Sequence, residues 1–388
     1  MTAEPTGDEK RPLSVAVLGA QHPHIFPRLD LLTGTFSEEC EVTGLYDRDA
    51  RVRDHVSATY GIAVHDDPHD ALQGAPDVVI VNGLDSENPE LIRLALPGPR
   101  AVLLEKVGAP TVARMRELVE YCAQYPAHVT VGFILHNSPV VPKLRQIVDS
   151  GVLGPITLAR FHAATPVGCS AEIWQSIPED LGGMVFTDGI HMVREIIGLL
   201  GVPDRVSARI RKLSARQSVS SDIFKEDILS GLGGEQDFEI GGLRYEDAGV
   251  LILDYAEHVA VMDMTAWEAH NWVEKWRLEL YGANATLEAG LMPPFYRLQV
   301  RRPNDAFGVG VHEQSFSDGA SAGAAISLVP DITYQNEMRA LLAAARAGST
   351  DQSELRAALQ CVEILGAAFE ASDAFSGIPV PAVAGWRS

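Results

Sequence analysis

The chain has 388 residues, of which 46% are hydrophobic and 21% charged, a composition typical of a globular protein long enough for two domains. A formal net charge of −21 argues against nucleic acid or an anionic membrane as a partner, because both require a basic face. No apolar run approaches the ~18 residues of a membrane span, and four scattered cysteines without a C-x-x-C spacing suit reduced thiols. We therefore expect a cytoplasmic protein, with tails at residues 1–12 and 376–388.

Short apolar strands alternate with helical stretches from residue 13 to about residue 135. The expected strands are 14–19, 41–47, 77–82, 101–106 and 128–133. The expected helices are 48–60, 89–96 and 111–124, the last with Thr111 as its cap. Strands separated by helices of this length predict an α/β fold, a Rossmann-like, doubly wound parallel sheet with helices on both faces.

A different pattern covers residues 136–375. Helices are expected at 142–150, 191–201, 330–347 and 352–371. Strands are expected at 155–162, 204–211, 249–255, 258–264 and 275–281. The last four strands lack intervening helices, which predicts an α+β domain with a large open, mostly antiparallel sheet. Two stretches rich in Ser, Gly or charge, 213–245 and 303–325, are expected to be long excursions.

Several chemically distinctive residues fall at the carboxyl ends of the strands in the first domain. In a parallel sheet these ends form one edge, and that edge binds the ligand. The residues are Gly19, Asp47, Asn82, Glu105 and Lys106. Their coincidence on one edge predicts a nucleotide-binding site there.

The first strand leads into the turn G-A-Q-H-P-H, where a dinucleotide-binding unit carries G-x-G-x-x-G. Gly19 is present, but Gln21 and His24 occupy the other two glycine positions, so a bound pyrophosphate must shift or gain other contacts. Asp47 ends the second strand, where an acid holds the ribose hydroxyls. Arg48 leaves room for a 2′-phosphate, so both NAD and NADP stay open as the cofactor.

Two other groups of residues invite a functional interpretation. His22 and His24 are two residues apart, but spacing fixes no third ligand, so we expect no metal and expect these residues to face the cofactor or substrate. Trp267, Trp272 and Trp276 resemble a substrate wall, although such aromatic residues are more often packed in a core or a subunit interface.

Four motifs in chain order resemble those of the Gfo/Idh/MocA oxidoreductases, the family of glucose–fructose oxidoreductase and inositol dehydrogenase. The first is the strand and turn followed by Asp47, and the second is L-L-E-K-V-G-A-P at 103–110, similar to the family's E-K-P motif. The third is G-V-L-G-P-I at 151–156, and the fourth is G-G-M-V-F-T-D-G-I-H at 182–191. L-E-L-Y-G-A-N-A-T-L at 278–287 also looks like the family's late strand and glycine turn.

The resemblance implies a Rossmann domain followed by a domain whose open sheet packs against another subunit, hence a homo-oligomer, a dimer or tetramer. It also implies hydride transfer between NAD(P) and a hydroxyl carbon of a sugar, cyclitol or related polyol. The family's E-K-P lysine maps to Lys106, which binds substrate and poises the reacting oxygen. The family histidine, the usual group for proton transfer, maps to His191.

The chain departs from the family pattern close to these catalytic positions. Val107 replaces the proline of E-K-P, and Arg194 stands where the family often has a second acid. The aspartate expected four residues before His191 is Thr187, whereas Asp188 comes one position later, a rotation of about 100° on a helix. We include Asp188 with Lys106 and His191 as candidate catalytic residues. For Thr187 and Asp188, capping of the helix N-terminus explains the residue type as well as a catalytic role does.

The leading hypothesis is an NAD(P)-dependent oxidoreductase acting on a sugar-like or polyol carbon. The candidate cofactor-binding residues are Gly19, Gln21, His22, His24, Asp47, Arg48, Asn82 and Glu105. One alternative is an enzyme without net redox change, which retains its cofactor for epimerisation or elimination. Another is a ligand-binding scaffold whose dinucleotide site has been lost, and the substituted glycines favour that alternative.

Overall fold

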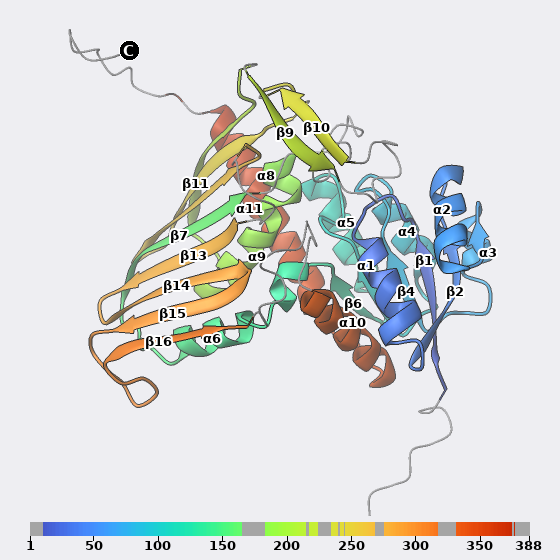
Figure 1. Cartoon of the computed structure of the whole chain (residues 1–388), viewed down its shortest axis with the longest axis horizontal. Coiled ribbons are helices and arrows are strands. Elements are labelled where there is room, and N and C mark those ends of the chain that lie inside the picture. The colour runs from blue at the N-terminus through green and yellow to red at the C-terminus, as the bar shows by residue number, and fades with distance from the viewer. Residues whose placement is uncertain are drawn as a thin grey trace, which may run out of the picture.

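The computed structural model describes residues 11–164, 183–214, 217–223, 234–239, 241–243, 245–267, 275–316, 331–374 and 376. Two sheets form its frame, one from each half of the chain, with helices packed between and around them (Figure 1). The predicted fold class, a Rossmann-like parallel sheet followed by an α+β domain with a mostly antiparallel sheet, is confirmed.

The N-terminal sheet has six strands in the order β3-β2-β1-β4-β5-β6, and every neighbouring pair is parallel. Its strands are β1 (Leu13–Leu18), β2 (Cys40–Tyr46), β3 (Val64–His65), β4 (Val78–Val81), β5 (Ala101–Leu104) and β6 (His128–Val131). The strands β1, β4 and β5 are almost entirely buried, as expected for a sheet covered on both faces. This strand order is that of a dinucleotide-binding Rossmann sheet.

Helices cover both faces of this sheet. They are α1 (Ile25–Asp30), which continues into the π-helical turn η2 (Leu31–Thr35), then α2 (Ala50–Tyr60), α3 (Pro68–Ala71), α4 (Asn88–Ala95) and α5 (Val112–Cys122). The Thr111 hydroxyl accepts a hydrogen bond from the Arg114 backbone N–H, which confirms the predicted cap of α5. The short helix η3 (Ile134–Asn137) follows β6 and leads into the second half.

The C-terminal sheet has eight strands in the order β16-β15-β14-β13-β7-β12-β11-β8. They are β7 (Ile156–Ala164), β8 (Arg205–Arg211), β11 (Ala248–Asp254), β12 (Val259–Thr265), β13 (Lys275–Gly282), β14 (Ala285–Met292), β15 (Pro294–Val300) and β16 (Gly310–Ser315). Only the β7–β12 pair is parallel. A separate hairpin pairs β9 (Ser218–Ile223) with β10 (Gly234–Glu239).

Helices line one face of the large sheet and link it to the Rossmann half. They are α6 (Val141–Asp149), α8 (Met184–Thr187), α9 (Gly189–Leu200), α10 (Asp331–Arg346) and α11 (Ser353–Asp373). The helix α9 contacts β7, and α11 contacts β8, but α11 also packs on α5 and β6 of the Rossmann half, as α10 does on β5 (Figure 1). The helix α11 therefore packs on both halves of the chain, whereas α10 packs on the Rossmann half, and the division at residues 135 and 136 stays a prediction.

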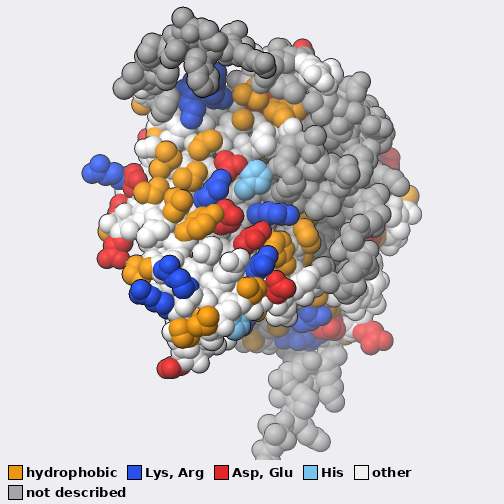
Figure 2. Space-filling view, turned by 60° about the vertical axis from the view of Figure 1, so that its left-hand side comes forward, with side chains coloured by type: hydrophobic (Ala, Val, Ile, Leu, Met, Phe, Trp, Pro, Cys, Tyr) orange, Lys and Arg blue, Asp and Glu red, His pale blue; other side chains and the backbone are white. Residues whose placement is uncertain are grey.

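In the described part of the chain, no helix covers the other face of the large sheet (Figure 1). Figure 2 shows hydrophobic and charged side chains interspersed on this side of the molecule. Four apolar side chains on it are more than one third exposed, namely Leu158, Val250, Ile252 and Val311. Among the described residues, no helix combines the length and apolar character needed to cross a membrane.

The structure differs from the sequence-based expectations mainly in the two predicted excursions. The described part of 213–245 contains the β9–β10 hairpin, and 303–325 contains β16. The two strands of this hairpin and the edge strand β16 are rich in polar residues and lack the apolar run on which the prediction relied. The first helix begins at Ile25, after a turn in which Ile25 and Phe26 donate backbone hydrogen bonds to the carbonyls of His22 and Pro23.

Candidate active site

Lys106 contacts the start of α9 from the carboxyl end of β5. Its Nζ donates to the Thr187 carbonyl at 2.9 Å and lies 3.1 Å from Asp188 Oδ1. The Asp188 backbone carbonyl in turn accepts a bond of 3.0 Å from the His191 N–H. The structure thus brings Lys106, Asp188 and His191 together, although Lys106 lies some eighty residues before the other two.

Of the two residues that could take the position of the family aspartate, Asp188 is the one whose side chain contacts Lys106. Asp188 is the residue that precedes α9, and its side chain caps no helix N–H. The Thr187 hydroxyl instead donates to the Gly183 carbonyl at 2.8 Å. Because Asp188 precedes the regular helix, the one-residue displacement from the family pattern does not turn its carboxylate away from Lys106.

Burial shapes the electrostatics of this cluster, since Lys106, Asp188 and His191 are 3%, 7% and 4% exposed. Burial raises the pKa of Asp188, although the Lys106 ammonium opposes the shift. Burial, with Lys106 adding to it, holds the pKa of His191 well below its usual value, so the imidazole is neutral at pH 7. A neutral imidazole can accept a proton.

Two buried polar atoms of the cluster have no hydrogen-bond partner in the described part of the chain. They are Asp188 Oδ2 and His191 Nδ1. Buried polar atoms are nearly always paired, so unpaired ones at a candidate site indicate a missing ligand. The rings of Phe133 and Trp276 pack edge-on against His191, with centroids 6.0 and 5.9 Å away, and fix its position.

The three tryptophans predicted to form a substrate wall do not lie together beside His191. Trp276 is buried beside His191, whereas the indole N–H of Trp267 donates to Asp247 at 2.7 Å. Trp272 lies outside the described residues.

The turn at residues 19–24 binds the acid that ends β2. Asp47 Oδ2 accepts from the Ala20 backbone N–H at 2.7 Å, and Asp47 Oδ1 accepts from Gln21 Nε2 at 3.2 Å and from the Asp49 N–H at 2.7 Å. Burial raises the pKa of Asp47, although these donors oppose the shift. The Gln21 amide therefore donates to a carboxylate oxygen of Asp47 that a ribose hydroxyl would otherwise use.

Gly19 is required by the packing of the turn. Its φ of +87° lies in the left-handed region, and a Cβ at this position would lie 2.5 Å from the backbone of Gly83. The first glycine of the fingerprint is therefore kept because two loops of the ligand edge meet there.

The predicted cofactor residues Asn82 and Glu105 are fully enclosed. Asn82 Oδ1 accepts from Arg28 Nη1 at 2.7 Å, and its Nδ2 donates to the His22 carbonyl at 2.9 Å. Glu105 binds Arg28 through Oε2 at 2.6 Å and His24 through Oε1 at 2.9 Å. Both residues hold the turn in place, and direct contact between either of them and a cofactor stays a prediction.

Arg48 and Arg194 have partners of their own. Arg48 is largely exposed and pairs with Glu87 at 2.9 Å, at the rim of the turn. Arg194 pairs with Glu354 at 2.7 Å and lies 3.0 Å from His136 Nε2, away from the lysine. Arg194 thus belongs to a separate polar cluster on α9.

Several residues of the site were missed from the sequence. Arg28, on α1, pairs with Glu337 of α10 at 2.8 Å, and both are buried. Asp85 accepts the Val107 N–H at 3.0 Å across the cis Lys106–Val107 peptide, and burial raises the pKa of Asp85 to about 6. A charged residue among apolar neighbours in a helix, such as Arg28, was the one sign in the sequence of a buried ion pair. Its partner Glu337 could not be identified, because no sequence spacing relates residues so far apart.

The residues of the turn fit a dinucleotide. The backbone N–H groups of Gln21 and His22 have no hydrogen-bond partner in the described part of the chain, and they precede helix α1. Such N–H groups suit a pyrophosphate, and Asp47 lies at the place where a ribose is bound. The Gln21 side chain competes for one oxygen of Asp47.

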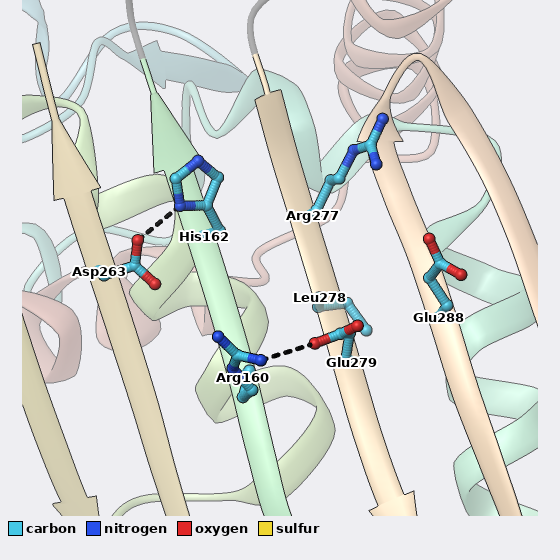
Figure 3. Close-up of a pocket in the computed structure, with 7 residues that line it drawn as sticks. All are labelled: Arg160, His162, Asp263, Arg277, Leu278, Glu279 and Glu288. Atoms are coloured by element: carbon cyan, nitrogen blue, oxygen red, sulfur yellow. Dashed lines mark hydrogen bonds and ion pairs between the residues drawn. The ribbon is translucent and has the colours of Figure 1, made fainter. Parts of the chain in front are cut away.

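A shallow cavity of about 350 Å³ lies elsewhere, on the outer face of the large sheet (Figure 3). Its charged side chains pair with one another, Arg160 with Glu279 and His162 with Asp263, and Arg277 and Glu288 complete the lining. Trp276, the neighbour of Arg277, is buried beside His191. Because successive strand residues point to opposite faces, this cavity is separated by the sheet from the Lys106 cluster.

Comparisons with known proteins agree with this architecture. The model of the family "oxidoreductase family, NAD-binding Rossmann fold" of the GFO/IDH/MocA group matches residues 13–133. The model of the GFO/IDH/MocA C-terminal domain matches residues 141–288. The two matches together cover more than half of the chain.

Curated relatives are less than 30% identical to this chain and match it over less than half of their own length. An uncharacterised oxidoreductase of Escherichia coli, YhhX, is 29% identical over 166 residues, 42% of this chain and 46% of its own. D-xylose 1-dehydrogenase [NADP(+)] of Haloarcula marismortui is 24% identical over 133 residues, 33% of this chain and 37% of its own. The chain thus spans about half or less of the length of these relatives.

Solved structures match nearly the whole chain at low identity, which shows the fold. Levoglucosan dehydrogenase in complex with NADH and levoglucosan superposes with a TM-score of 0.73 at 13% identity, covering 94% of this chain and 98% of the other. An oxidoreductase from Agrobacterium radiobacter, in complex with NAD⁺, L-tartaric acid and magnesium, gives 0.71 at 14% identity, with coverage of 93% and 96%. The chain belongs to the Gfo/Idh/MocA oxidoreductase family, and its residues 13–133 are that family's NAD-binding Rossmann domain.

Proposed function

We propose that the chain moves a hydride between a nicotinamide cofactor and a hydroxyl-bearing carbon of a sugar, cyclitol or related polyol. One observation carries the proposal: Lys106 Nζ, Asp188 and His191 meet in a buried cluster that leaves Asp188 Oδ2 and His191 Nδ1 without partners among the described residues. A hydroxyl group can donate to one of these atoms and accept from another donor, as a polyol does.

The cofactor would be held by Gly19, by the free N–H groups of Gln21 and His22, and by Asp47. When bound, the nicotinamide supplies the hydride acceptor or donor. The buried Asp47 carboxylate favours the unphosphorylated ribose of NAD, because a 2′-phosphate would place like charges together. Arg48, already paired with Glu87, is the residue that a 2′-phosphate would have to recruit.

Lys106 and His191 would act on the reacting oxygen. The ammonium of Lys106, held by Asp188 and the Thr187 carbonyl, stabilises negative charge that develops on the alcohol oxygen as the hydride leaves its carbon. The neutral His191 accepts the hydroxyl proton at Nδ1. Phe133 and Trp276 exclude water beside this imidazole.

The substrate class rests on the family and on two relatives. A D-xylose dehydrogenase and a levoglucosan dehydrogenase share the fold or part of the sequence, and both act on sugar-like alcohols by name. Buried polar groups aimed at hydroxyls strongly disfavour an apolar alcohol, which would leave them unpaired.

We also propose that the open face of the large sheet packs on a second copy of the chain. Leu158, Val250 and Ile252 expose apolar surface there, among ion pairs such as Arg160 with Glu279. Ile252→Glu should lower the mass measured by light scattering to that of a monomer. Val202→Glu, at an exposed valine outside the sheet, should leave it unchanged, and an unchanged mass in Ile252→Glu would exclude this interface.

The test of the proposed reaction is a panel of sugars, cyclitols and polyols assayed with NAD⁺ and NADP⁺ by formation of the reduced cofactor. Turnover of at least one compound supports the proposal. Tight cofactor binding without net turnover on any would favour epimerisation or elimination with a retained cofactor. Failure to bind either cofactor would favour a ligand-binding scaffold, for which the Gln21–Asp47 contact is the specific observation.

A further inference from the structure

Two histidines of the turn and one glutamate of β5's carboxyl end bring three potential ligand atoms within 4.8 Å of one another. Glu105 Oε1 lies 2.9 Å from His24 Nδ1 and 3.9 Å from His22 Nε2. Ligand atoms held at about 2.0–2.1 Å from a tetrahedral zinc ion lie roughly 3.4 Å apart. The observed separations bracket that value, so an ion can enter after small side-chain shifts.

A second layer of contacts fixes the orientation of these side chains. The other carboxylate oxygen of Glu105 accepts from Arg28 Nη1 at 2.6 Å, and the same nitrogen donates to Asn82 at 2.7 Å. Asn82 also donates to the His22 carbonyl at 2.9 Å. Metal ligands are characteristically held by such outer hydrogen bonds, which leave one carboxylate oxygen turned to the ion.

The two cationic side chains near the three residues are both paired with carboxylates, which reduces their repulsion of a metal ion. Arg28 faces two carboxylates, those of Glu105 and Glu337, while Lys106 is paired with Asp188.

We propose that His22, His24 and Glu105 bind a zinc ion or another first-row divalent transition-metal ion. Two imidazoles and a carboxylate suit such ions, whereas magnesium and calcium prefer oxygen ligands alone. Three protein ligands leave at least one position for water or for an oxygen of a bound molecule. The glycines missing from the turn are thereby explained in part, since His24 replaces the last of them.

The experiment measures metal directly and does not depend on activity. The full chain is purified without an affinity tag that binds metal, its metal content is measured by mass spectrometry, and the chelated protein is titrated with Co²⁺ while visible absorption is followed. We expect one ion per chain, with the absorption of a four- or five-coordinate Co²⁺ site. His22→Ala should weaken the affinity by roughly 100-fold or more, beyond the loss seen when outer contacts are removed.

The matched control is His162→Ala, which removes a histidine paired with an acid on the outer face of the sheet. It should bind Co²⁺ as the unchanged chain does. Thermal unfolding with and without EDTA checks the fold of His22→Ala. EDTA should lower the melting temperature of the unchanged chain and of His162→Ala, but not that of His22→Ala. A chain without stoichiometric metal or Co²⁺ uptake, or a folded His22→Ala with unaltered affinity, would overturn the proposal.

NADH binding is followed in the same samples, so the two proposals fail separately. Metal uptake without NADH binding overturns the cofactor role alone. NADH binding without metal uptake overturns the metal site alone.

Discussion

The turn at residues 19–24 and the cluster of Lys106, Asp188 and His191 both depart from the family pattern, but with different physical consequences. In the cluster, the aspartate is displaced by one residue and its carboxylate still lies 3.1 Å from the lysine. In the turn, two glycines are replaced and new contacts appear, Gln21 with Asp47 and His24 with Glu105. The adjacent residues Glu105 and Lys106 join the two regions.

The difference follows from what each region must do. The cluster works through side-chain atoms, and a side chain that precedes a helix can reach its partner from a neighbouring position. The turn works through close approach of its backbone to a pyrophosphate, and any added side chain changes that approach. We therefore expect substitutions in the cluster to alter turnover, and substitutions in the turn to alter cofactor affinity.

The largest effect is expected for Lys106→Met, which removes the ammonium while keeping an apolar chain of similar length. Turnover should fall by roughly 10³-fold, the range found when a charge-stabilising donor is lost, while the Kd for NADH should change little. Stopped assays and fluorescence titration measure the two quantities. Lys212→Met, at an exposed lysine, is the control, and unchanged turnover in Lys106→Met would remove this lysine from the reaction.

A second prediction concerns Glu246, which holds the segment that leads into the cluster by accepting the Gly183 N–H at 2.8 Å. Burial raises its pKa to about 7, above the unfolded value of 4.5. The stability that it contributes is therefore fully present below pH 4.5 and is lost as the pH rises through 7. Glu246→Gln should remove about 2.5 kcal/mol of the decline in unfolding free energy between pH 5 and pH 8.

Urea denaturation at both pH values measures this decline, and Glu38→Gln, at an exposed acid, should leave it unaltered. An equal decline in Glu246→Gln and the unchanged chain would show that Glu246 does not titrate in this range.

Gln21→Gly is expected to improve a property of the protein, namely its affinity for NADH, by a smaller factor than that by which Lys106→Met lowers turnover. The change releases Asp47 Oδ1 and restores the second glycine of the fingerprint, so the affinity for NADH should rise about three- to tenfold, the value of one modest hydrogen bond. Fluorescence titration measures it, and turnover per bound cofactor should stay constant. Weaker binding would mean that the Gln21 amide contacts the cofactor instead of competing with it.

The smallest effect is expected at Arg48. Because Arg48 is largely exposed and paired with Glu87, Arg48→Ala should change the Kd for NADH less than about twofold, within the range of a surface ion pair. The Kd for NADPH should rise more. A larger loss for NADH than for NADPH would contradict the proposed preference for the unphosphorylated ribose.

The sequence alone predicts much of the fold, because buried parallel strands have a clear apolar signature. β1, β4 and β5 follow it, and Asp47 and Lys106 are placed correctly on the ligand edge. The polar strands of the β9–β10 hairpin lack this signature. The approach of Asp188 to Lys106 was anticipated only through the family resemblance, since no periodicity joins the two residues.

The contacts of the turn could not be predicted from the sequence, because they join residues that are far apart along the chain. His22 and His24 were recognised as a possible pair of ligands, but Glu105 lies 81 residues from His24 and was assigned to the cofactor. Arg28 and Glu337 are 309 residues apart. Pairings at such separations are set by how α1, β5 and α10 pack, and packing is not encoded in local spacing.

Whether the turn binds a nicotinamide cofactor is measured by titrating the purified chain with NADH and NADPH, followed by nicotinamide fluorescence and thermal shift. We expect saturable binding at one site per chain with a submillimolar Kd, tighter for NADH than for NADPH, and equal in Lys106→Met. Absence of binding to both cofactors at millimolar concentration would contradict this expectation, and would show that the rebuilt turn no longer holds a dinucleotide.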